Sequence, residues 1–289
     1  MDPRHKVTPA LLKKLSPLRL NVRRPFRGLR EGIRRSKVKG AGIEFADFRA
    51  YVPGDDPRFI DWKAYARLDR VYLRLFLEER SLNVYLMLDV SGSMGFGKLD
   101  LGRAVALSLA HIALLSYDSV VLIPFSERPG HPARTSGRRG IFKLMSIAGM
   151  FEPSGRTDLR RSLAGFLNMR WEPGLLILIS DLLDPAVPEA LKIPLLGGFE
   201  LDVIQVLSAE EIDPKPSGAL TLVDAETDER REVVLDEASI ERYKRRMERF
   251  LRGIEEFCAS KGVRYALIRT DEPVERAVFG RLRRAGIVI

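Results

Sequence analysis

The chain has 289 residues, is 45% hydrophobic and carries a net charge of +9, so it can bury a sizeable core in one large domain or two small ones. Its one cysteine, Cys258, excludes an intrachain disulfide framework and favours a reducing compartment. No apolar run approaches the roughly 20 residues that span a bilayer, and the N-terminus has no signal-peptide core, so we expect a cytoplasmic protein or one peripheral to the membrane.

The positive charge is concentrated at the N-terminus. Residues 1–39 contain 13 Lys and Arg against 2 Asp and Glu, whereas residues 40–289 contain 35 against 37. Such a segment is typical either of an arm for nucleic acid or anionic lipid, or of a solvated tail. Phe26 is its only aromatic residue, which gives base stacking little support. We therefore expect residues 1–39 to be a mobile basic segment, with a short helix near residues 9–15, and nucleic acid is not the expected partner.

Residues 40–80 have a different sequence pattern from this segment. Pro53-Gly54 indicates a turn, and residues 58–67 could form a short helix with Asp55 or Asp56 near its start. Apolar residues alternate with polar ones over residues 71–78, which predicts a strand. We expect this region to be an extension that packs on the main domain.

From residue 81 onward, predicted strands alternate with predicted helices. The strands are expected at 84–90, 120–126, 175–180, 201–207 and 264–269. The helices are expected at 101–117, 142–150, 158–169, 186–191, 239–261 and 274–284. This alternation predicts an α/β fold for residues 81–289, with a doubly wound, mostly parallel sheet and helices on both faces. A β-hairpin from segments 219–222 and 232–235 would be inserted within about 209–237, and residues 127–139 are expected to be a basic loop.

The most informative motif follows the first of these strands: Asp89-Val-Ser91-Gly-Ser93. Alternate positions of an extended segment point the same way, so the acid and the two hydroxyls can face one point. Hard oxygen donors suit Mg²⁺, and the absence of His and Cys from this turn speaks against zinc or a thiol nucleophile. Asp181 follows another strand and Thr157 precedes a helix. In a parallel α/β sheet, ligands bind beyond the carboxyl ends of the strands, and both residues are expected at that edge.

Asp89, Ser91, Ser93, Thr157 and Asp181 together resemble the metal-ion-dependent adhesion site of von Willebrand factor type A domains, whose pattern is DxSxS…T…D. The resemblance covers residues 81–289 as a fold. It implies that Ser91, Ser93 and Thr157 ligate the metal directly, while the two acids act mainly through water. It also implies Mg²⁺ as the ion, with Mn²⁺ or Ca²⁺ as alternatives, and a protein partner that presents an acidic side chain to the metal.

The region upstream narrows the resemblance to the bacterial proteins grouped as domain of unknown function fifty-eight. The matching segments are Gly42–Phe45, Arg49–Tyr51, Gly54–Asp56, Arg58–Trp62 and Arg67, with Leu222–Thr227 and Tyr243 further on. Members are often encoded beside MoxR-type AAA+ ATPases, which implies an adaptor or assembly role with such an ATPase. Many members also carry membrane helices near the N-terminus, and no such helix is expected in this sequence.

Two other functions use parts of the same sequence. Gly92–Lys98 matches the nucleotide-binding pattern G-x-x-x-x-G-K, but Leu99 stands where a Ser or Thr should reach Mg²⁺. Residues 1–39 could bind nucleic acid electrostatically. The parts of a hydrolase are missing, since Ser91 lies outside a G-x-S-x-G elbow and the histidines lie elsewhere. The expected function is metal-dependent protein binding without catalysis, so the protein is not expected to be an enzyme.

Overall fold

The computed structural model describes residues 2–23, 44–52, 55, 57, 60–68, 70–77, 82–184, 186–215, 218–223, 226 and 230–289. The chain divides into two compact units, one of residues 1–23 with 82–289 and the other of residues 24–81. The expected turn at Pro53-Gly54 and Asp56, expected near the start of the following helix, lie outside the described residues.

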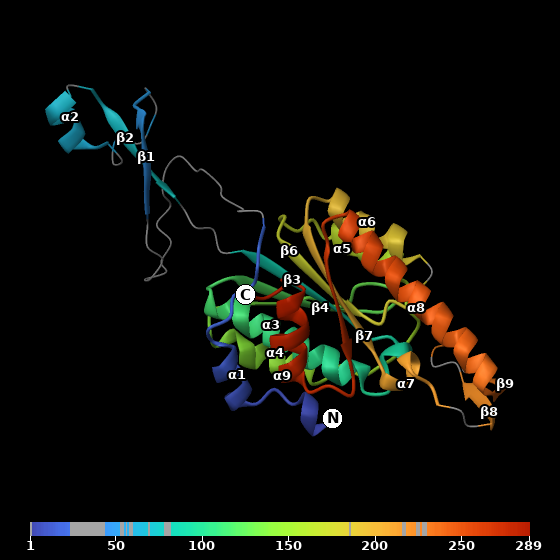
Figure 1. Ribbon diagram of the computed structural model, residues 1–289. Coiled ribbons are helices and arrows are strands. Elements are labelled where there is room, and N and C mark those ends of the chain that lie inside the picture. The colour runs from blue at the N-terminus through green and yellow to red at the C-terminus, as the bar shows by residue number, and fades with distance from the viewer. Residues whose placement is uncertain are drawn as a thin grey trace. The chain divides into compact units, whose positions relative to one another are not determined.

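A six-stranded sheet forms the centre of the larger unit, in the order β10-β7-β6-β3-β4-β5 (Figure 1). Its strands are β3 (Asn83–Asp89), β4 (Ser119–Phe125), β5 (Ala133–Ser136), β6 (Leu175–Ser180), β7 (Glu200–Leu207) and β10 (Arg264–Arg269). Neighbouring strands are parallel except β4 and β5, which are antiparallel. This confirms the predicted α/β fold with a mostly parallel sheet. The expectation of a loop throughout 127–139 is wrong, because β5 pairs there with the edge of β4.

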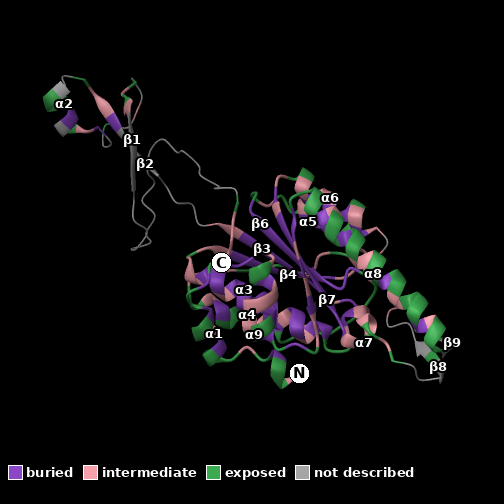
Figure 2. Ribbon diagram, viewed as in Figure 1, coloured by how far each residue is buried: buried purple, intermediate pink, exposed green. Residues whose placement is uncertain are grey.

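Helices cover both faces of this sheet. Successive residues of a buried strand point to opposite sides, so each strand contributes side chains to both layers. Val84, Leu86 and Leu88 of β3 belong to one apolar cluster, while Tyr85 and Met87 belong to the other. The first cluster packs under α1 (Pro9–Leu15), α3 (Lys98–Leu115), α4 (Gly140–Ala148), α9 (Val274–Arg276) and the π-helical turn η4 (Ala277–Leu282). The second packs under α5 (Leu159–Asn168), α6 (Val187–Leu196) and α8 (Glu237–Ser260). Figure 2 shows the buried strands between these two layers.

The N-terminal residues 2–23 are part of this core, so the expectation of a mobile segment is wrong for them. After the short turn η1 (Pro3–His5), α1 buries Leu11 and Leu15, which are 2% and 0% exposed. Leu20 then pairs with Val288 in an antiparallel bridge. The leucines among the basic residues form one apolar side of α1, and burying that side holds the segment on the body. Residues 24–39 lie outside the described residues.

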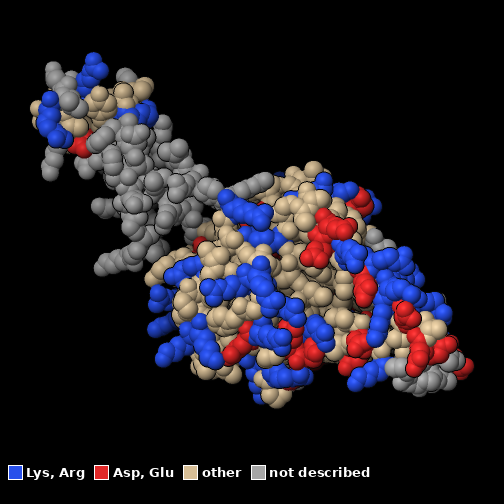
Figure 3. All heavy atoms as spheres, in the orientation of Figure 1, with Lys and Arg blue, Asp and Glu red and all other residues tan. Residues whose placement is uncertain are grey.

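The inserted hairpin is confirmed between β7 and α8. It consists of β8 (Gly218–Val223) and β9 (Arg230–Leu235), preceded by the short helix α7 (Ala209–Ile212). The helix α8 begins at Glu237, and its cap is Asp236, whose carboxylate accepts a hydrogen bond of 2.7 Å from the Ser239 amide. Acidic and basic side chains are intermixed along α8 (Figure 3) and include the exposed pair Arg245–Glu241.

The smaller unit, residues 24–81, contains β1 (Glu44–Ala50), β2 (Tyr72–Leu77) and α2 (Trp62–Leu68), with the two strands antiparallel. Its buried residues include Ile60, Ala64 and Leu73. Asp61 precedes α2 and accepts a hydrogen bond of 3.0 Å from the Ala64 amide. Asp55, expected near the start of this helix, instead pairs with Arg49 at 3.0 Å. How residues 40–80 pack on the main domain stays a prediction.

Candidate functional site

The turn after β3 is fixed by its own side chains. Asp89 and Ser91 are both 0% exposed. Asp89 Oδ1 accepts hydrogen bonds from the Ser91 amide at 2.9 Å and from the Ser91 hydroxyl at 2.6 Å. Ser93 lies next to this pair, and its hydroxyl oxygen is 3.0 Å from that of Ser91. The structure therefore brings the three residues of the DxSxS motif together. The short turn η3 (Gly92–Met94), which contains Ser93, precedes α3.

The end of β6 adds two residues to this edge. Leu88 of β3 pairs with Ile179 of β6 in parallel register, which places the following Ser180 beside Asp89. The Ser180 hydroxyl donates to Asp89 Oδ2 at 2.7 Å. Asp181 comes next, is 1% exposed, and accepts a bond of 3.3 Å from the Leu183 amide. The prediction for Asp181 did not include Ser180, although its position as the last residue of a strand beside Asp89 could have indicated it.

Asp181 is paired with a buried lysine. Lys98, the first residue of α3, is 1% exposed, and its ammonium lies 2.8 Å from Asp181 Oδ2 and 2.6 Å from Glu211 Oε1. Burial by itself would lower the pKa of Lys98, but the charges of Asp181 and Glu211 raise it above its usual value. Lys98 is thus held as a cation between two carboxylates. The sequence interpretation gave it a role only in the nucleotide-binding alternative.

Thr157 lies on a loop that is tied to the turn by backbone hydrogen bonds. The Gly92 amide donates to the Gly155 carbonyl at 2.9 Å, and the Ser154 amide donates to the Val90 carbonyl at 2.8 Å. Thr157 is half-buried, and its hydroxyl donates to the Glu226 carboxylate at 2.9 Å. The loops bearing all five predicted residues therefore meet at the carboxyl edge of the sheet.

The electrostatics of Asp89 bear on whether a cation fits here. Its three hydrogen-bond donors, from Ser91 and Ser180, are neutral groups. Burial, and after it the charge of Asp181, raise the pKa of Asp89 to about 7. A divalent cation beside this carboxylate would offset the cost of burying its charge. The hydroxyls of Ser91 and Ser93 add the hard oxygen atoms that Mg²⁺ prefers.

Within the described part of the chain, no three His, Cys, Asp or Glu side chains gather so as to hold a metal ion. A cation at this edge would therefore depend on hydroxyl oxygens as much as on carboxylates. The donor set of Asp89, Ser91, Ser93 and Thr157 has this composition, and it suits Mg²⁺ better than a softer metal such as zinc.

Two bulky residues in the loops at this edge have left-handed backbone conformations. Phe96 has a φ of +54° and Leu182 a φ of +55°. Such conformations are costly for side chains of this kind, and they tend to occur where surrounding structure fixes a functional loop. Phe96 is also 82% exposed, and Leu183 is 42% exposed. The two loops thus present apolar side chains to solvent next to the polar residues.

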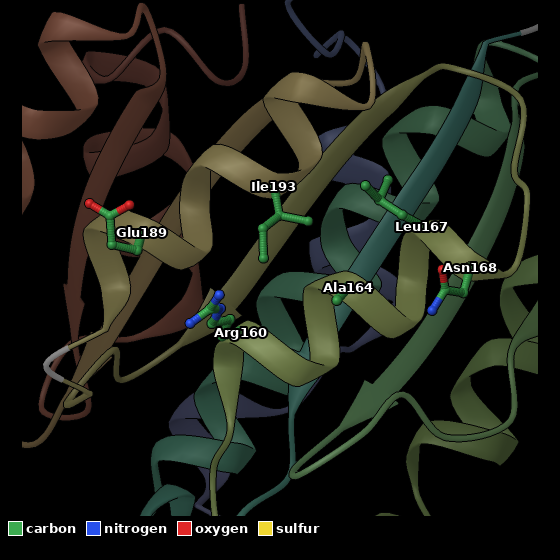
Figure 4. A pocket seen from close by; sticks show the side chains of 6 residues that line it. All are labelled: Arg160, Ala164, Leu167, Asn168, Glu189 and Ile193. Carbon is green, nitrogen blue, oxygen red and sulfur yellow. The ribbon is translucent and has the colours of Figure 1, made fainter.

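Two surface hollows lie elsewhere and contain none of the five predicted residues. One, of about 420 Å³, lies between α5 and α6 and is lined by Arg160, Ala164, Leu167, Asn168, Glu189 and Ile193 (Figure 4). The other includes Asn83 and Ser119, the first residues of β3 and β4, so it lies at the opposite edge of the sheet. The carboxyl edge remains the place where the chemistry-bearing residues meet.

These features define an α/β protein with a six-stranded, mostly parallel sheet and a buried polar cluster beyond its central strands. Residues 47–250 match the family described as "Protein of unknown function DUF58", and the chain belongs to this family. The predicted membership of that family is confirmed. Among the described residues, no helix is long and apolar enough to span a membrane.

Similar proteins include Uncharacterized protein Rv1480 of Mycobacterium tuberculosis and Uncharacterized protein Mb1516 of Mycobacterium bovis. Each is 28% identical over 239 residues, which cover 80% of this chain and 75% of the mycobacterial protein. Among solved structures, the conserved hypothetical protein BatB from Bacteroides thetaiotaomicron is 15% identical with a TM-score of 0.42, covering 71% of this chain and 98% of that chain. An aerotolerance-related membrane protein from Bacteroides fragilis is 16% identical with a TM-score of 0.38, covering 71% and 100%.

Proposed function

We propose that this protein binds a divalent cation, Mg²⁺ in the first place, at the carboxyl edge of the sheet and uses it to bind the acidic side chain of a partner protein. The observation that carries the proposal is the buried Asp89 carboxylate, whose donors are neutral and whose neighbours are the Ser91 and Ser93 hydroxyls. Mn²⁺ or Ca²⁺ are the alternative ions. We also propose that the sheet is doubly wound, as in von Willebrand factor type A domains.

Each residue has its own part in this proposal. Ser91, Ser93 and Thr157 would supply hydroxyl oxygens to the cation, while Asp89 holds the Ser91 hydroxyl in place and supplies negative charge. Asp181 would act at longer range, since Lys98 already neutralises part of its charge. When bound, the cation supplies a positive charge and a coordination position that a carboxylate from another molecule can take.

The partner would meet apolar surface around the cation. Phe96 and Leu183 are exposed in the loops that carry the site, so an acidic residue flanked by an apolar one is the complementary sequence. By the resemblance in the sequence, the partner is a MoxR-type AAA+ ATPase or one of its clients, and the protein acts as a cytoplasmic adaptor without catalysis.

The nucleotide-binding alternative has less support. Lys98 would have to reach phosphate groups, but its ammonium is buried between Asp181 and Glu211. The nucleic-acid alternative requires a free basic arm, whereas in its described part, residues 2–23, Lys14 pairs with Glu275 and Arg23 donates to the Gly262 carbonyl.

Affinity capture tests the proposal when it is done on the full chain in Mg²⁺ and, in parallel, in chelator. We expect partner proteins to be retained in Mg²⁺ and lost in chelator, and also lost from the Asp89→Asn variant in Mg²⁺. The Asp158→Asn variant changes the cap of α5 but keeps an acceptor for the Arg161 amide, so it serves as the control and should retain them. Partners that bind equally well with chelator and to the Asp89→Asn variant would refute the proposal.

A further inference from the structure

The β8–β9 hairpin places a carboxylate of this same chain on the candidate site. Glu226 lies between β8 and β9 and is half-buried. Its Oε1 atom accepts a hydrogen bond of 2.9 Å from the Thr157 hydroxyl and a second bond of 3.3 Å from the Thr157 amide. Thr157 is one of the predicted cation ligands, so an acidic side chain already lies where the proposed function needs one.

The loop that holds Thr157 is fixed to the turn that holds Ser91 and Ser93. Two backbone hydrogen bonds, Gly92 to Gly155 and Ser154 to Val90, join them. Glu226 therefore approaches the same edge as the DxSxS residues, although it comes from an insertion that begins after β7.

The oxygen separations suit an octahedral ion. Metal–oxygen distances of about 2.0–2.1 Å around Mg²⁺ put adjacent ligand oxygens of an octahedron about 2.8–3.0 Å apart. The two hydroxyl oxygens of Ser91 and Ser93 are 3.0 Å apart, and those of Thr157 and Glu226 are 2.9 Å apart. Hydrogen-bonded pairs with these separations can become neighbouring ligands without large side-chain movements.

We infer that Glu226 is a ligand of the cation and takes the coordination position that a partner's acidic side chain would use. The inference rests on the proposed function. Because the carboxylate is part of the chain, its effective concentration at the site is on the order of millimolar. A partner must therefore compete with Glu226, whose carboxylate must leave the ion when the partner binds.

Mn²⁺ binding to the full chain provides the test, with the metal alone as the probe. Mn²⁺ affinity and the number of exchangeable waters on the bound ion are measured by electron paramagnetic resonance and water proton relaxation. Glu226→Gln should weaken Mn²⁺ binding by about tenfold and add an exchangeable water at the ion. It should also allow acetate to bind the ion, as seen in the loss of that water, whereas the wild-type protein should not respond to acetate.

Glu232→Gln is the matched control, because Glu232 is an exposed acid on β9 of the same hairpin. It should leave affinity, hydration and the lack of an acetate response unchanged. Glu226→Asp keeps the charge but shortens the side chain by one methylene, and it should fall between wild type and Glu226→Gln. Circular dichroism checks that each variant is folded.

The outcomes separate this inference from the proposed function. If Glu226→Gln binds Mn²⁺ with wild-type affinity and hydration while Asp89→Asn loses Mn²⁺, the assignment of Glu226 is overturned and the cation site stands. If the wild-type protein does not bind Mn²⁺ or Mg²⁺, both fall.

Discussion

Lys98 illustrates how one side chain affects both the stability and the chemistry of the candidate site. It is 1% exposed, and its ammonium lies between the carboxylates of Asp181 and Glu211. Removing one member of a buried ion pair leaves the other charge uncompensated, which costs far more than the pair contributes. The same ammonium repels any cation that approaches Asp181.

The Lys98→Met variant should therefore be less stable without metal, by about 3–5 kcal/mol, and should bind Mn²⁺ more tightly than the wild-type protein. Chemical unfolding with and without Mn²⁺ measures both effects, and stabilisation by Mn²⁺ should be larger in the variant. Lys192→Met, which removes an exposed lysine paired with Glu189, should change neither. Weaker Mn²⁺ binding in Lys98→Met would show that this ammonium does not oppose the cation.

At the scale of single elements, the N-terminal helix α1 contributes to the core rather than acting as a tail. Leu15 is 0% exposed and belongs to the apolar cluster that α3 also covers. Leu15→Ala should lower the free energy of unfolding by about 2–5 kcal/mol, because it leaves a cavity in that cluster. Lys13→Ala, on the exposed side of α1, should change it by no more than about 0.5 kcal/mol. Urea unfolding measures both, and equal small effects would mean that α1 is not held on the body.

The contact between α1 and α3 should also depend on pH through His111. Its Nε2 atom lies 3.1 Å from the Leu12 carbonyl oxygen, and burial lowers the pKa of His111 below its usual value, although this hydrogen bond opposes the shift. The unfolded chain takes up a proton on this residue near pH 6.5, while the folded chain resists it. The stability contributed by neutral His111 is therefore present above about pH 6.5 and is lost as the pH falls.

His111→Gln should reduce the loss of stability between pH 7.5 and pH 5, since its amide can still donate to Leu12 but does not titrate. Thermal unfolding of the two proteins at a series of pH values provides the comparison. A pH dependence that is identical in both would show that His111 does not contribute to it.

The elements that could be predicted from sequence are those whose signal is local. Strands β3 and β6 are apolar runs that end at Asp89 and at Ser180, with Asp181 next in the chain, so both the strands and the acids at their ends could be predicted. Strand β5 has only Ala133 buried, and it exists because β4 offers an unpaired edge. The contact between Glu226 and Thr157 joins residues that are 69 positions apart, and no local pattern indicates it.

At the scale of the whole molecule, the role of the N-terminal residues follows from how the chain divides into two units and not from its net charge. The basic residues 1–39 were expected to act as one segment, but residues 2–23 belong to the larger unit and residues 24–81 form another. Arg4 shows why charge alone misled, since its guanidinium binds Asp2 and the Asp271 carbonyl rather than remaining free. The functional surface that follows from the fold is the carboxyl edge of the sheet, with Glu226 beside it.

Isothermal titration of the full chain with Mg²⁺ tests the existence of the cation site most directly. The site predicts saturable binding of one ion, weakened at least about 10-fold by Ser93→Ala because that hydroxyl is a proposed ligand. Ser154→Ala removes an exposed hydroxyl from the neighbouring loop and should bind Mg²⁺ as the wild-type protein does. Absence of saturable binding in the wild-type protein, or equal binding by all three proteins, would contradict a cation at this edge of the sheet.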